Sequence, residues 1–138
     1  MSIDIKDTAV AAALERAIGH IGPYSEGELA GVRALRIVGA ETLHDLTGCS
    51  GLEELAVVGS SVTDLAALSG MARLRALSVL ACPVTSAEGL VGLERLEELR
   101  LDFTFVEDAS PLFALPSLRR ARALGNPWNE SSWQPVLL

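Results

Sequence analysis

The stretch LEELAVVGSSVTDLAALSGMAR (residues 52–73) is followed directly by LRALSVLACPVTSAEGLVGLER (74–95) and LEELRLDFTFVEDASPLFALPS (96–117). Each segment has 22 residues and carries apolar or small side chains at the same eight sites. A fixed period of this length is typical of a repeat protein in which successive units stack and share one hydrophobic core. The period therefore indicates the fold before any local pattern is considered.

The repetition continues on both sides of this stretch. A shortened copy starts at Val32, has Leu35 and Ile37 at the expected sites, and reaches Leu52 after 20 residues. A further copy starts at Leu118 and then departs from the pattern. We therefore expect about five repeats.

The spacing within each copy is L-x-x-L-x-L-x-x-(N/C)-x-L, which resembles the bacterial leucine-rich repeat family with 22-residue, internalin-type repeats. The resemblance implies an α/β solenoid with a curved parallel sheet of about five short strands, one in each repeat, on its concave side. It also implies a convex side built from turns or short 3₁₀ segments. At the turn after the strand, where the family usually has asparagine, this chain has Ala40, Ser60, Cys82, Thr104 and Asn126.

The N-terminal region predicts a helical cap over the first repeat. Asp7 is a candidate N-cap for a helix that ends at Gly19. Ser25 and Glu28 form the capping box of a second short helix. Both helices are expected to cover the open edge of the first repeat, which otherwise exposes apolar side chains to water.

We expect a single domain over residues 1–138. It comprises a helical cap over 1–31, repeats over 32–117, and a last strand with a C-terminal cap over 118–138. Trp128, within a terminal segment that is similar to the ends of internalin-type proteins, falls on a buried site of the repeat.

Composition and charge limit the class of partner. A formal net charge of -7 disfavours binding to nucleic acid or to an anionic membrane, because the average surface repels both. Charged residues and glycines interrupt the apolar runs, so no segment reaches the roughly 20 residues that span a bilayer. The first residues lack the basic start of a secretory signal, and a cytoplasmic location is therefore expected.

Residues that carry chemistry are few. His20 and His44 have no partner at the same phase of another repeat. Cys49 aligns with apolar sites of the return segment, and Cys82 occupies the turn site, so both are predicted core residues. No phosphate-binding loop, zinc-protease helix or nucleophile-elbow motif is present in the sequence. The sequence therefore predicts no catalytic residue, metal ligand or cofactor.

Strand positions that alternate away from the core form columns across stacked repeats. One column alternates in sign and predicts a ladder of cross-strand ion pairs: Arg33, Glu53, Arg75, Glu97 and Arg119. Another column is apolar except at one position: Val38, Val58, Leu80, Asp102 and Leu124. An exposed apolar strip beside charged residues indicates a partner-binding surface. In the alternative interpretation, these side chains only support the turn.

The third full repeat departs from the others directly after its strand. Phe103 stands where the other copies have glycine or alanine, and Phe105 follows two residues later. Aromatic and arginine side chains dominate the energetics of protein interfaces, so this corner is the predicted hot spot. In the alternative interpretation, Phe105 packs against the terminal cap around Trp128 or Trp133. The basic and acidic neighbours expected at this corner are Arg100, Asp102, Arg120 and Arg122.

The sequence predicts a non-catalytic protein-interaction module, an adaptor or scaffold, that binds a protein partner through the concave face and the ascending loops. An alternative is an immunity or inhibitor protein for a basic toxin or enzyme, which only the net charge supports. An enzyme, or a nucleic-acid binder that uses Arg100, Arg119, Arg120 and Arg122, ranks below both. Neither the partner's identity nor an oligomeric state follows from the sequence. The candidate partner-binding residues are Val58, Leu80, Arg100, Asp102, Phe103, Phe105, Arg120, Arg122 and Leu124.

Overall fold

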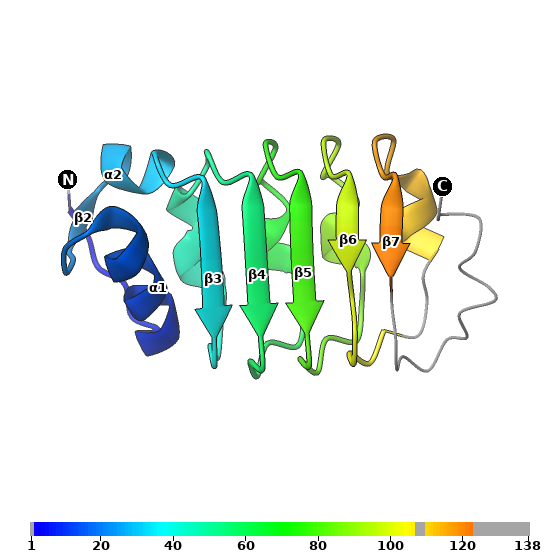
Figure 1. Cartoon of the computed structure of the whole chain (residues 1–138), viewed down its shortest axis with the longest axis horizontal. Helices are drawn as coiled ribbons and strands as arrows, with labels where there is room; N and C mark the ends of the chain where they lie inside the picture. Colours follow the sequence, from blue (N-terminus) through cyan, green and yellow to red (C-terminus); the bar gives the residue numbers. More distant parts are fainter. Residues whose placement is uncertain (1, 107–109, 123–138) are drawn as a thin grey trace.

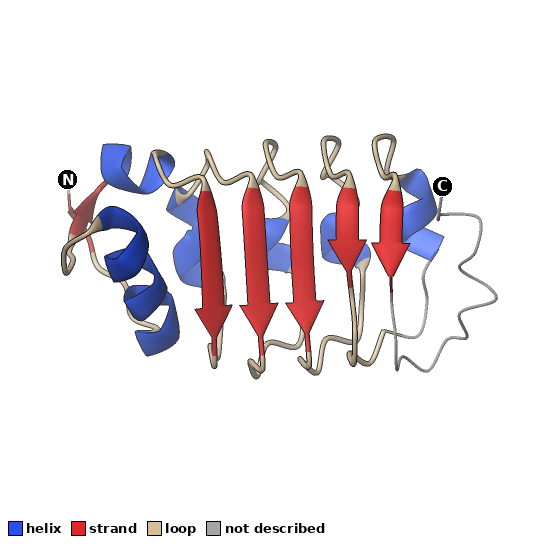
Figure 2. Ribbon diagram, viewed as in Figure 1, coloured by secondary structure: helices blue, strands red, loops and turns tan. Residues whose placement is uncertain are grey.

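A computed structural model of the chain describes residues 2–106 and 110–122. In these residues five parallel strands form one sheet in the order β3-β4-β5-β6-β7 (Figure 1), which confirms the predicted strand number and direction. A return segment with a short 3₁₀ helix follows each of the first four strands and lies on the opposite side of the sheet (Figure 2). The strands are β3 (Ala34–Val38), β4 (Glu54–Val58), β5 (Ala76–Leu80), β6 (Glu98–Arg100) and β7 (Arg120–Arg122). The 3₁₀ helices are η1 (His44–Gly48), η2 (Ala66–Leu68), η3 (Glu88–Leu90) and η4 (Ser110–Ala114).

The register of the sheet follows the sequence period. Leu55 lies opposite Leu77, Leu77 opposite Leu99, and Leu99 opposite Ala121, so residues 22 positions apart are neighbours. Between β3 and β4 the step is shorter, since Leu35 lies opposite Leu55. The shortened first repeat therefore stacks without disturbing the register, because its return segment is shorter and its strand keeps its full length.

A buried apolar spine runs through the whole stack. The inward side chains of every strand are buried, and so are the leucines of the return segments, such as Leu46, Leu68 and Leu90. Cys49 and Cys82 are also buried, as the repeat phase predicts. Because each layer buries its apolar side chains only against its neighbours, the spine stabilises the solenoid as a linear stack.

The N-terminal cap has the two predicted helices, α1 (Thr8–Ile18) and α2 (Glu26–Ala30), beside the β3 end of the sheet (Figure 1). Asp7 caps α1, and Gly19 ends it with a left-handed backbone, φ 101°. Ser25 and Glu28 complete the capping box of α2. A short antiparallel pair that the sequence did not predict, β1 (Ser2–Ile3) with β2 (Tyr24–Ser25), joins the two ends of the cap. None of the helices in the described ranges is long and apolar enough to cross a membrane.

Asp7 also joins the cap to the first repeat. One carboxylate oxygen accepts hydrogen bonds from the backbone N–H groups of Ala9 (2.9 Å) and Val10 (3.1 Å), and the other accepts from Glu41 (2.8 Å) and Thr42 (3.2 Å). Burial alone would raise the pKa of the Asp7 carboxyl, but these four N–H donors outweigh it and lower the pKa below its usual value.

Asp45 of η1 makes the reciprocal contact from the repeat side. Its carboxylate accepts hydrogen bonds from the backbone N–H groups of Lys6 (3.0 Å) and Asp7 (2.8 Å). The carboxylates of Asp7 and Asp45 thus hold the N-terminus of α1 against the segment that follows β3.

The turn site tolerates its substitutions because each polar side chain there bonds to nearby backbone. Ser60 accepts a hydrogen bond from the N–H of Ala40 (2.9 Å) and donates to the carbonyl of Val58 (3.2 Å). Cys82 donates through its thiol to Leu80 (3.3 Å), and Thr104 donates to the carbonyl of Leu101 (3.2 Å). At three of the five turn sites a side chain therefore bonds to nearby backbone groups.

Candidate interaction surface

The outward side chains of β3 to β7 form one continuous surface opposite the 3₁₀ helices, which we call the sheet face. Across β3 to β5 this face is hollowed by about 450 Å³. Much of the hollow is lined by residues with short side chains, namely Ala34, Ala56, Ala76 and Ser78. Small side chains of this kind leave room for a ligand to approach the strands closely.

The residues directly before the strands form much of the predicted ion-pair ladder. Glu53 bridges Arg33 (2.7 Å) and Arg75 (3.4 Å), and Glu97 pairs with Arg119 (3.9 Å). Within the described residues no ion pair joins Arg75 to Glu97. The hydrogen bond from Arg33 lowers the pKa of Glu53 below its usual value. Since the arginines are exposed and the two glutamates are only half-buried, each pair stabilises the sheet by only about a few tenths of a kcal/mol.

The apolar strip of the sheet face becomes less exposed from β3 toward β5. Val38 is 54% exposed, whereas Val58 and Leu80 are half-buried. Leu124, the last predicted member of the strip, lies outside the described residues. The strip thus offers apolar surface at the carboxyl ends of β3 to β5.

Asp102 does not interrupt the strip as an exposed charge, contrary to the expectation from the alternating pattern. It is only 3% exposed and lies under Arg122, whose Nη2 donates to Oδ2 at 2.6 Å and whose Nε donates to the same oxygen at 3.1 Å. The hydrogen bond to Asp102 raises the pKa of Arg122. Asp102 is not an exposed member of the strip because β6 ends at Arg100, which places Asp102 in the turn and not in the strand. Asp102 and Arg122 are therefore engaged with each other.

The remaining predicted arginines differ in their partners. Arg120 pairs with Glu98 across β7 and β6 at 3.6 Å. Arg100 is exposed and makes no ion pair within the part of the chain that the structure describes. Arg100 is thus free to meet a carboxylate from outside.

Phe103 occupies the backbone conformation that favours glycine. The corresponding residues Gly39, Gly59 and Ala81 have φ of 81°, 54° and 56°, and Phe103 has φ of 57°. A side chain with a Cβ in this left-handed region costs about 1 kcal/mol, and a bulky one is a clear outlier. Phe103 is 63% exposed, so packing within the described fold does not compensate this cost.

Phe105 projects from the same loop and is 57% exposed. A backbone hydrogen bond from Phe105 N–H to the carbonyl of Val84 (2.8 Å) ties the loop to the preceding repeat. The alternative in which Phe105 packs against Trp128 or Trp133 involves residues outside the described ranges. Both aromatic side chains therefore stand at the surface on a loop with a defined backbone.

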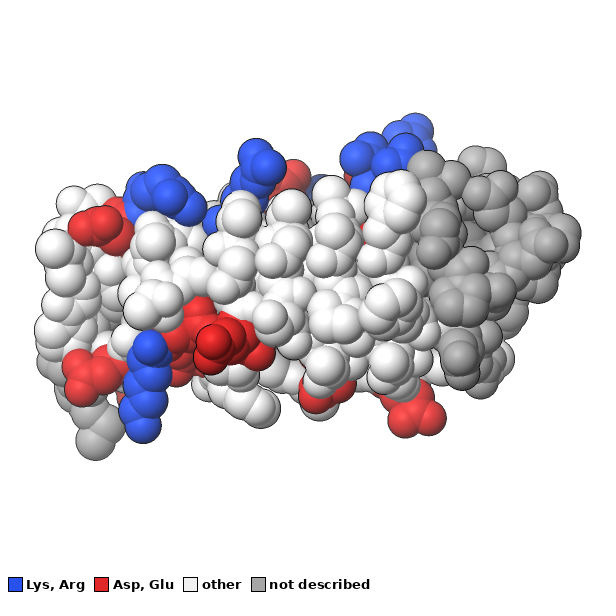
Figure 3. Space-filling view, turned by 90° about the horizontal axis from the view of Figure 1, so that it is seen from below, with Lys and Arg blue, Asp and Glu red and all other residues white. Residues whose placement is uncertain are grey.

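Together with the loops after β3, β4 and β5, these phenylalanines form a largely uncharged edge, which we call the carboxyl edge. Figure 3 shows this edge: uncharged side chains cover most of it, basic side chains gather along its upper border, and acidic side chains lie along its lower border and in its left part. The exposed or half-buried residues of this edge are Val38, Gly39, Val58, Gly59, Ser61, Leu80, Ala81, Pro83, Phe103 and Phe105. An uncharged band bordered by arginines has the anatomy of an interface core with a polar rim.

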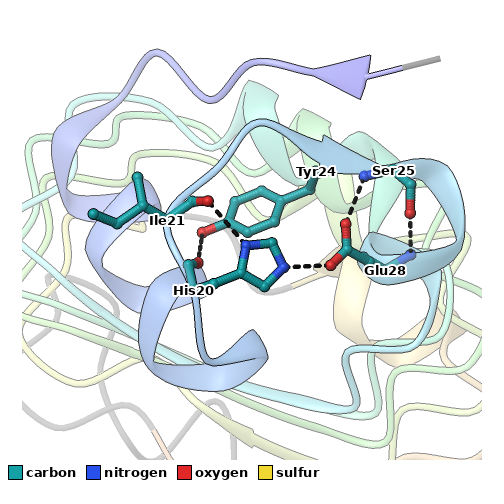
Figure 4. Close-up of polar contacts among 5 residues, drawn as sticks. All are labelled: His20, Ile21, Tyr24, Ser25 and Glu28. Atoms are coloured by element: carbon teal, nitrogen blue, oxygen red, sulfur yellow. Dashed lines mark hydrogen bonds and ion pairs between the residues drawn. The ribbon is translucent and has the colours of Figure 1, made fainter.

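A polar cluster in the N-terminal cap was missed by the sequence analysis (Figure 4). His20 Nε2 lies 2.5 Å from a carboxylate oxygen of Glu28, and its Nδ1 lies 2.9 Å from the carbonyl of Ile21. The Tyr24 hydroxyl donates to the His20 carbonyl at 2.8 Å. Because both ring nitrogens face acceptors, the imidazolium form is favoured, and the bonds to Ile21 and Glu28 raise the pKa of His20. The cluster closes the loop between α1 and α2.

No sequence signal could have predicted this cluster. His20 and Glu28 are eight residues apart on opposite sides of a turn, and Glu28 was already assigned to the capping box. The two roles use different carboxylate oxygens, since Oε1 accepts from the Ser25 N–H at 3.0 Å. The arrangement positions α2.

The two cysteine thiols are poorly suited to react. Burial raises the pKa of Cys49 to about 11, and burial also raises the pKa of Cys82. Both side chains are therefore protonated thiols at neutral pH, and the thiolate is the reactive form. Among residues 2–106 and 110–122, no group of three or more His, Cys, Asp or Glu side chains is placed to hold a metal ion.

No protein-family model matches the chain, and no curated protein matches it. Several solved structures do. Internalin C2 from Listeria monocytogenes superposes with a TM-score of 0.66 at 22% identity, covering 89% of this chain and 66% of that one. The plant peptide hormone receptor RGFR1, in complex with RGF2, gives a TM-score of 0.61 at 17% identity over 74% of this chain and 18% of that one.

A third similar structure contains the CBM51-2 and INT domains of ZmpB from Clostridium perfringens, with a TM-score of 0.56 and 22% identity. It matches 72% of this chain and 20% of that chain. The chain thus spans about two thirds of internalin C2 and about a fifth of the other two proteins. At these identities the likeness concerns the fold. The parallel register, the 3₁₀ return segments and the superposition on internalin C2 together identify the fold of the chain as a leucine-rich repeat solenoid.

Proposed function

We propose that this chain is a non-catalytic protein-interaction module, an adaptor or scaffold, which binds one protein partner through the sheet face and the carboxyl edge. The observation that carries the proposal is Phe103, a large exposed aromatic side chain held in a backbone conformation that favours glycine. Strain of this kind persists where it serves a purpose outside the fold. Binding to a partner is the purpose that an exposed phenylalanine fits.

The chemistry of the surrounding surface supports the same function. Phe103 and Phe105 supply apolar area, and Arg100 on the neighbouring sheet face supplies a guanidinium that makes no ion pair with any described residue. Aromatic and arginine residues are the commonest hot spots of protein interfaces. An aromatic pair at the border between an uncharged edge and a charged face can therefore anchor a partner while the arginines set its orientation.

The size of the surface explains why both regions are needed. Five strands about 4.8 Å apart and about 17 Å long give a sheet face of roughly 20 by 17 Å. A stable interface covers roughly 800 Å² on each partner. The sheet face alone is smaller than this, so the carboxyl edge is expected to contribute much of the contact area.

One of the similar solved structures offers a precedent for binding by such a scaffold. RGFR1 is a receptor that was solved in complex with RGF2, and a segment of it has the fold of this chain. That structure supports the proposal that such a scaffold presents a binding surface.

Inhibition of a basic toxin or enzyme is the second candidate, and the net charge of -7 is the observation that favours it. A basic partner would have to avoid the sheet face, because exposed arginines without an ion pair to any described residue lie there. It would instead dock on the return segments or the cap, where acidic residues such as Glu41, Asp64 and Glu88 are exposed. Variants at Phe103 would then leave binding unchanged.

A cytoplasmic location in a bacterial cell is part of the same proposal. It is tested by fractionating the source cells and probing each fraction for the protein. Recovery of the protein from a membrane or secreted fraction would contradict it.

The interaction is tested by using the purified protein as bait in lysate of its own source cells. The informative variants are Phe103→Gly, which keeps the left-handed backbone, and Phe105→Ser. Val91→Ser is the matched control, because Val91 is an exposed apolar residue beside η3, away from the carboxyl edge. Arg122 is a poor choice here, since its substitution would expose the buried carboxylate of Asp102.

We expect one protein to be captured by the native chain and by Val91→Ser, and at least tenfold less of it by Phe103→Gly. The loss follows from removal of an interface aromatic side chain, which commonly costs 2 kcal/mol or more of binding free energy. Equal capture by all four proteins would reject the carboxyl edge as the binding surface.

A further inference from the structure

Charges of opposite sign are segregated on this protein. The sheet face, the residues directly before its strands and the Asp102 carboxylate under Arg122 together hold seven of the eleven basic residues and five of the eighteen acidic residues. The formal charge of this surface is therefore +2, whereas the rest of the chain carries -9. The basic members are Arg33, Arg36, Arg75, Arg100, Arg119, Arg120 and Arg122, and the acidic members are Glu53, Glu54, Glu97, Glu98 and Asp102.

Five of these seven arginines are engaged with carboxylates of the protein itself. Arg36 and Arg100 are the two that make no ion pair or side-chain hydrogen bond within the described residues, and both are exposed. An unpaired arginine offers a planar set of donors that suits a carboxylate. The two free guanidinium groups are thus the available anion-binding groups of the sheet face.

Arg36 and Arg100 stand in one row across the sheet. The register places Arg36 opposite Ala56, Ala56 opposite Ser78, and Ser78 opposite Arg100. Three strand spacings therefore separate the two arginines, which is about 14 Å. An extended chain places residues i and i+4 about 13 Å apart and on the same side. A helix places the same residues only about 6 Å apart.

The space between the two arginines suits a middle side chain. Ala56 and Ser78 form the floor of the 450 Å³ hollow, so residue i+2 of an extended segment can enter it. Glu54 also lines this hollow and makes no ion pair within residues that the structure describes. Its charge disfavours an acid at i+2 and permits an apolar side chain there.

We propose that the sheet face binds an extended acidic segment of a protein partner, laid across β3 to β6 with two carboxylates four residues apart on Arg36 and Arg100 and an apolar side chain between them. This inference rests on the proposed function and names the part of the partner that the sheet face receives. A segment of about six residues covers the width of the sheet, which agrees with the small area of this face. The partner's remaining contacts fall on the carboxyl edge.

The proposal is tested with short labelled peptides that are blocked at both ends. The probe has two aspartates four residues apart, a leucine midway, and glycine and serine elsewhere. The matched peptides have the same composition with adjacent aspartates, a glutamate in place of the leucine, or lysines in place of the aspartates. Binding to the full chain is measured by fluorescence anisotropy at low ionic strength, where exposed charges are least screened.

Three variants of the protein accompany the peptides. Arg36→Gln and Arg100→Gln each remove one anchoring charge, and Arg33→Gln is the control, since Arg33 is equally basic and exposed but already pairs with Glu53. We expect each anchoring variant to weaken the spaced peptide about tenfold, and the control to change its affinity less than twofold. The adjacent-aspartate, central-glutamate and lysine peptides are each expected to bind at least tenfold more weakly than the probe.

Equal binding of the spaced and adjacent peptides, or no effect of Arg36→Gln and Arg100→Gln, would overturn the proposal. So would tighter binding of a single-stranded oligonucleotide with the same arginine dependence, because the occupant would then be a nucleic acid. A captured partner that requires Phe103 but tolerates both anchoring variants would refute this inference alone. A partner indifferent to Phe103, Arg36 and Arg100 would refute the proposed function as well.

Discussion

The two halves of the sheet are built on the same repeat and end differently. Strands β3, β4 and β5 each have five residues and pair along their whole length. Strands β6 and β7 have three residues, and the chain leaves β6 through a buried Asp102 and a left-handed Phe103. The first half presents a hollow of small side chains, whereas the second presents arginines and an aromatic edge.

The buried side chains show no such difference. Leu77 and Val79 of the first half are as fully buried as Leu99 and Leu101 of the second. Burial of the spine therefore sets the fold equally in both halves, while the outward and turn positions vary without changing it. A repeat protein can thus alter its binding surface one layer at a time, because each outward side chain contacts few others.

Truncation of a spine leucine in each half has the largest expected effect on the free energy of unfolding. It tests most directly whether the two halves are packed equally well. Leu77→Ala and Leu99→Ala should each lower the free energy of unfolding by about 2–5 kcal/mol, since both leave a cavity in a packed layer. Urea titrations followed by circular dichroism measure both losses. If Leu99→Ala costs less than about 1 kcal/mol, the second half is not packed like the first.

The anchor of the first half to the N-terminal cap should give a smaller effect. Asp7→Ala removes four backbone hydrogen bonds and is expected to lower the free energy of unfolding by about 1–2 kcal/mol. Hydrogen exchange should then speed up in α1 and β3 and not in β6. Asp64→Ala is the control, because Asp64 is exposed and, among the described residues, its carboxylate accepts a hydrogen bond from the Ala66 N–H alone.

The same carboxylate predicts a dependence on pH. The pKa of Asp7 is lower in the folded protein than in the unfolded chain, so its contribution is complete above the unfolded pKa and is lost as pH falls through the folded value. Between pH 5 and pH 2, roughly, the stability of Asp7→Ala should therefore fall less steeply than that of the native protein. Parallel curves for the two proteins would contradict the prediction.

Substitutions at the left-handed turn position should change the free energy of unfolding least, and the change should have opposite signs in the two halves. Phe103→Gly should raise the free energy of unfolding by about 1 kcal/mol, and Gly59→Ala should lower it by about 1 kcal/mol. A Cβ at Gly59 meets nothing within 4 Å, so its cost is that of the backbone conformation alone. Destabilisation by Phe103→Gly would show that Phe103 serves the fold, and it would remove the main support for a binding role.

Sequence reasoning predicted most of what depends on local or periodic rules. The caps of α1 and α2, the burial of both cysteines and three steps of the ladder between Arg33 and Arg119 follow from spacing alone. It did not predict the β1 to β2 pair or the burial of Asp102. Both depend on contacts between residues about 20 positions apart in the chain. The repeat pattern describes core sites and does not predict these contacts.

Periodicity was sufficient for the stack and its buried side chains, because each layer repeats the contacts of the one before it, and the resemblance to internalin-type repeats implied the parallel direction of the strands. The folded arrangement alone decided which charged residues are satisfied and which remain free. Pairing depends on how long side chains cross between strands within a few ångströms, and a one-dimensional pattern does not contain those distances. For this reason Asp102 with Arg122, and the unpaired state of Arg36 and Arg100, became visible only in three dimensions.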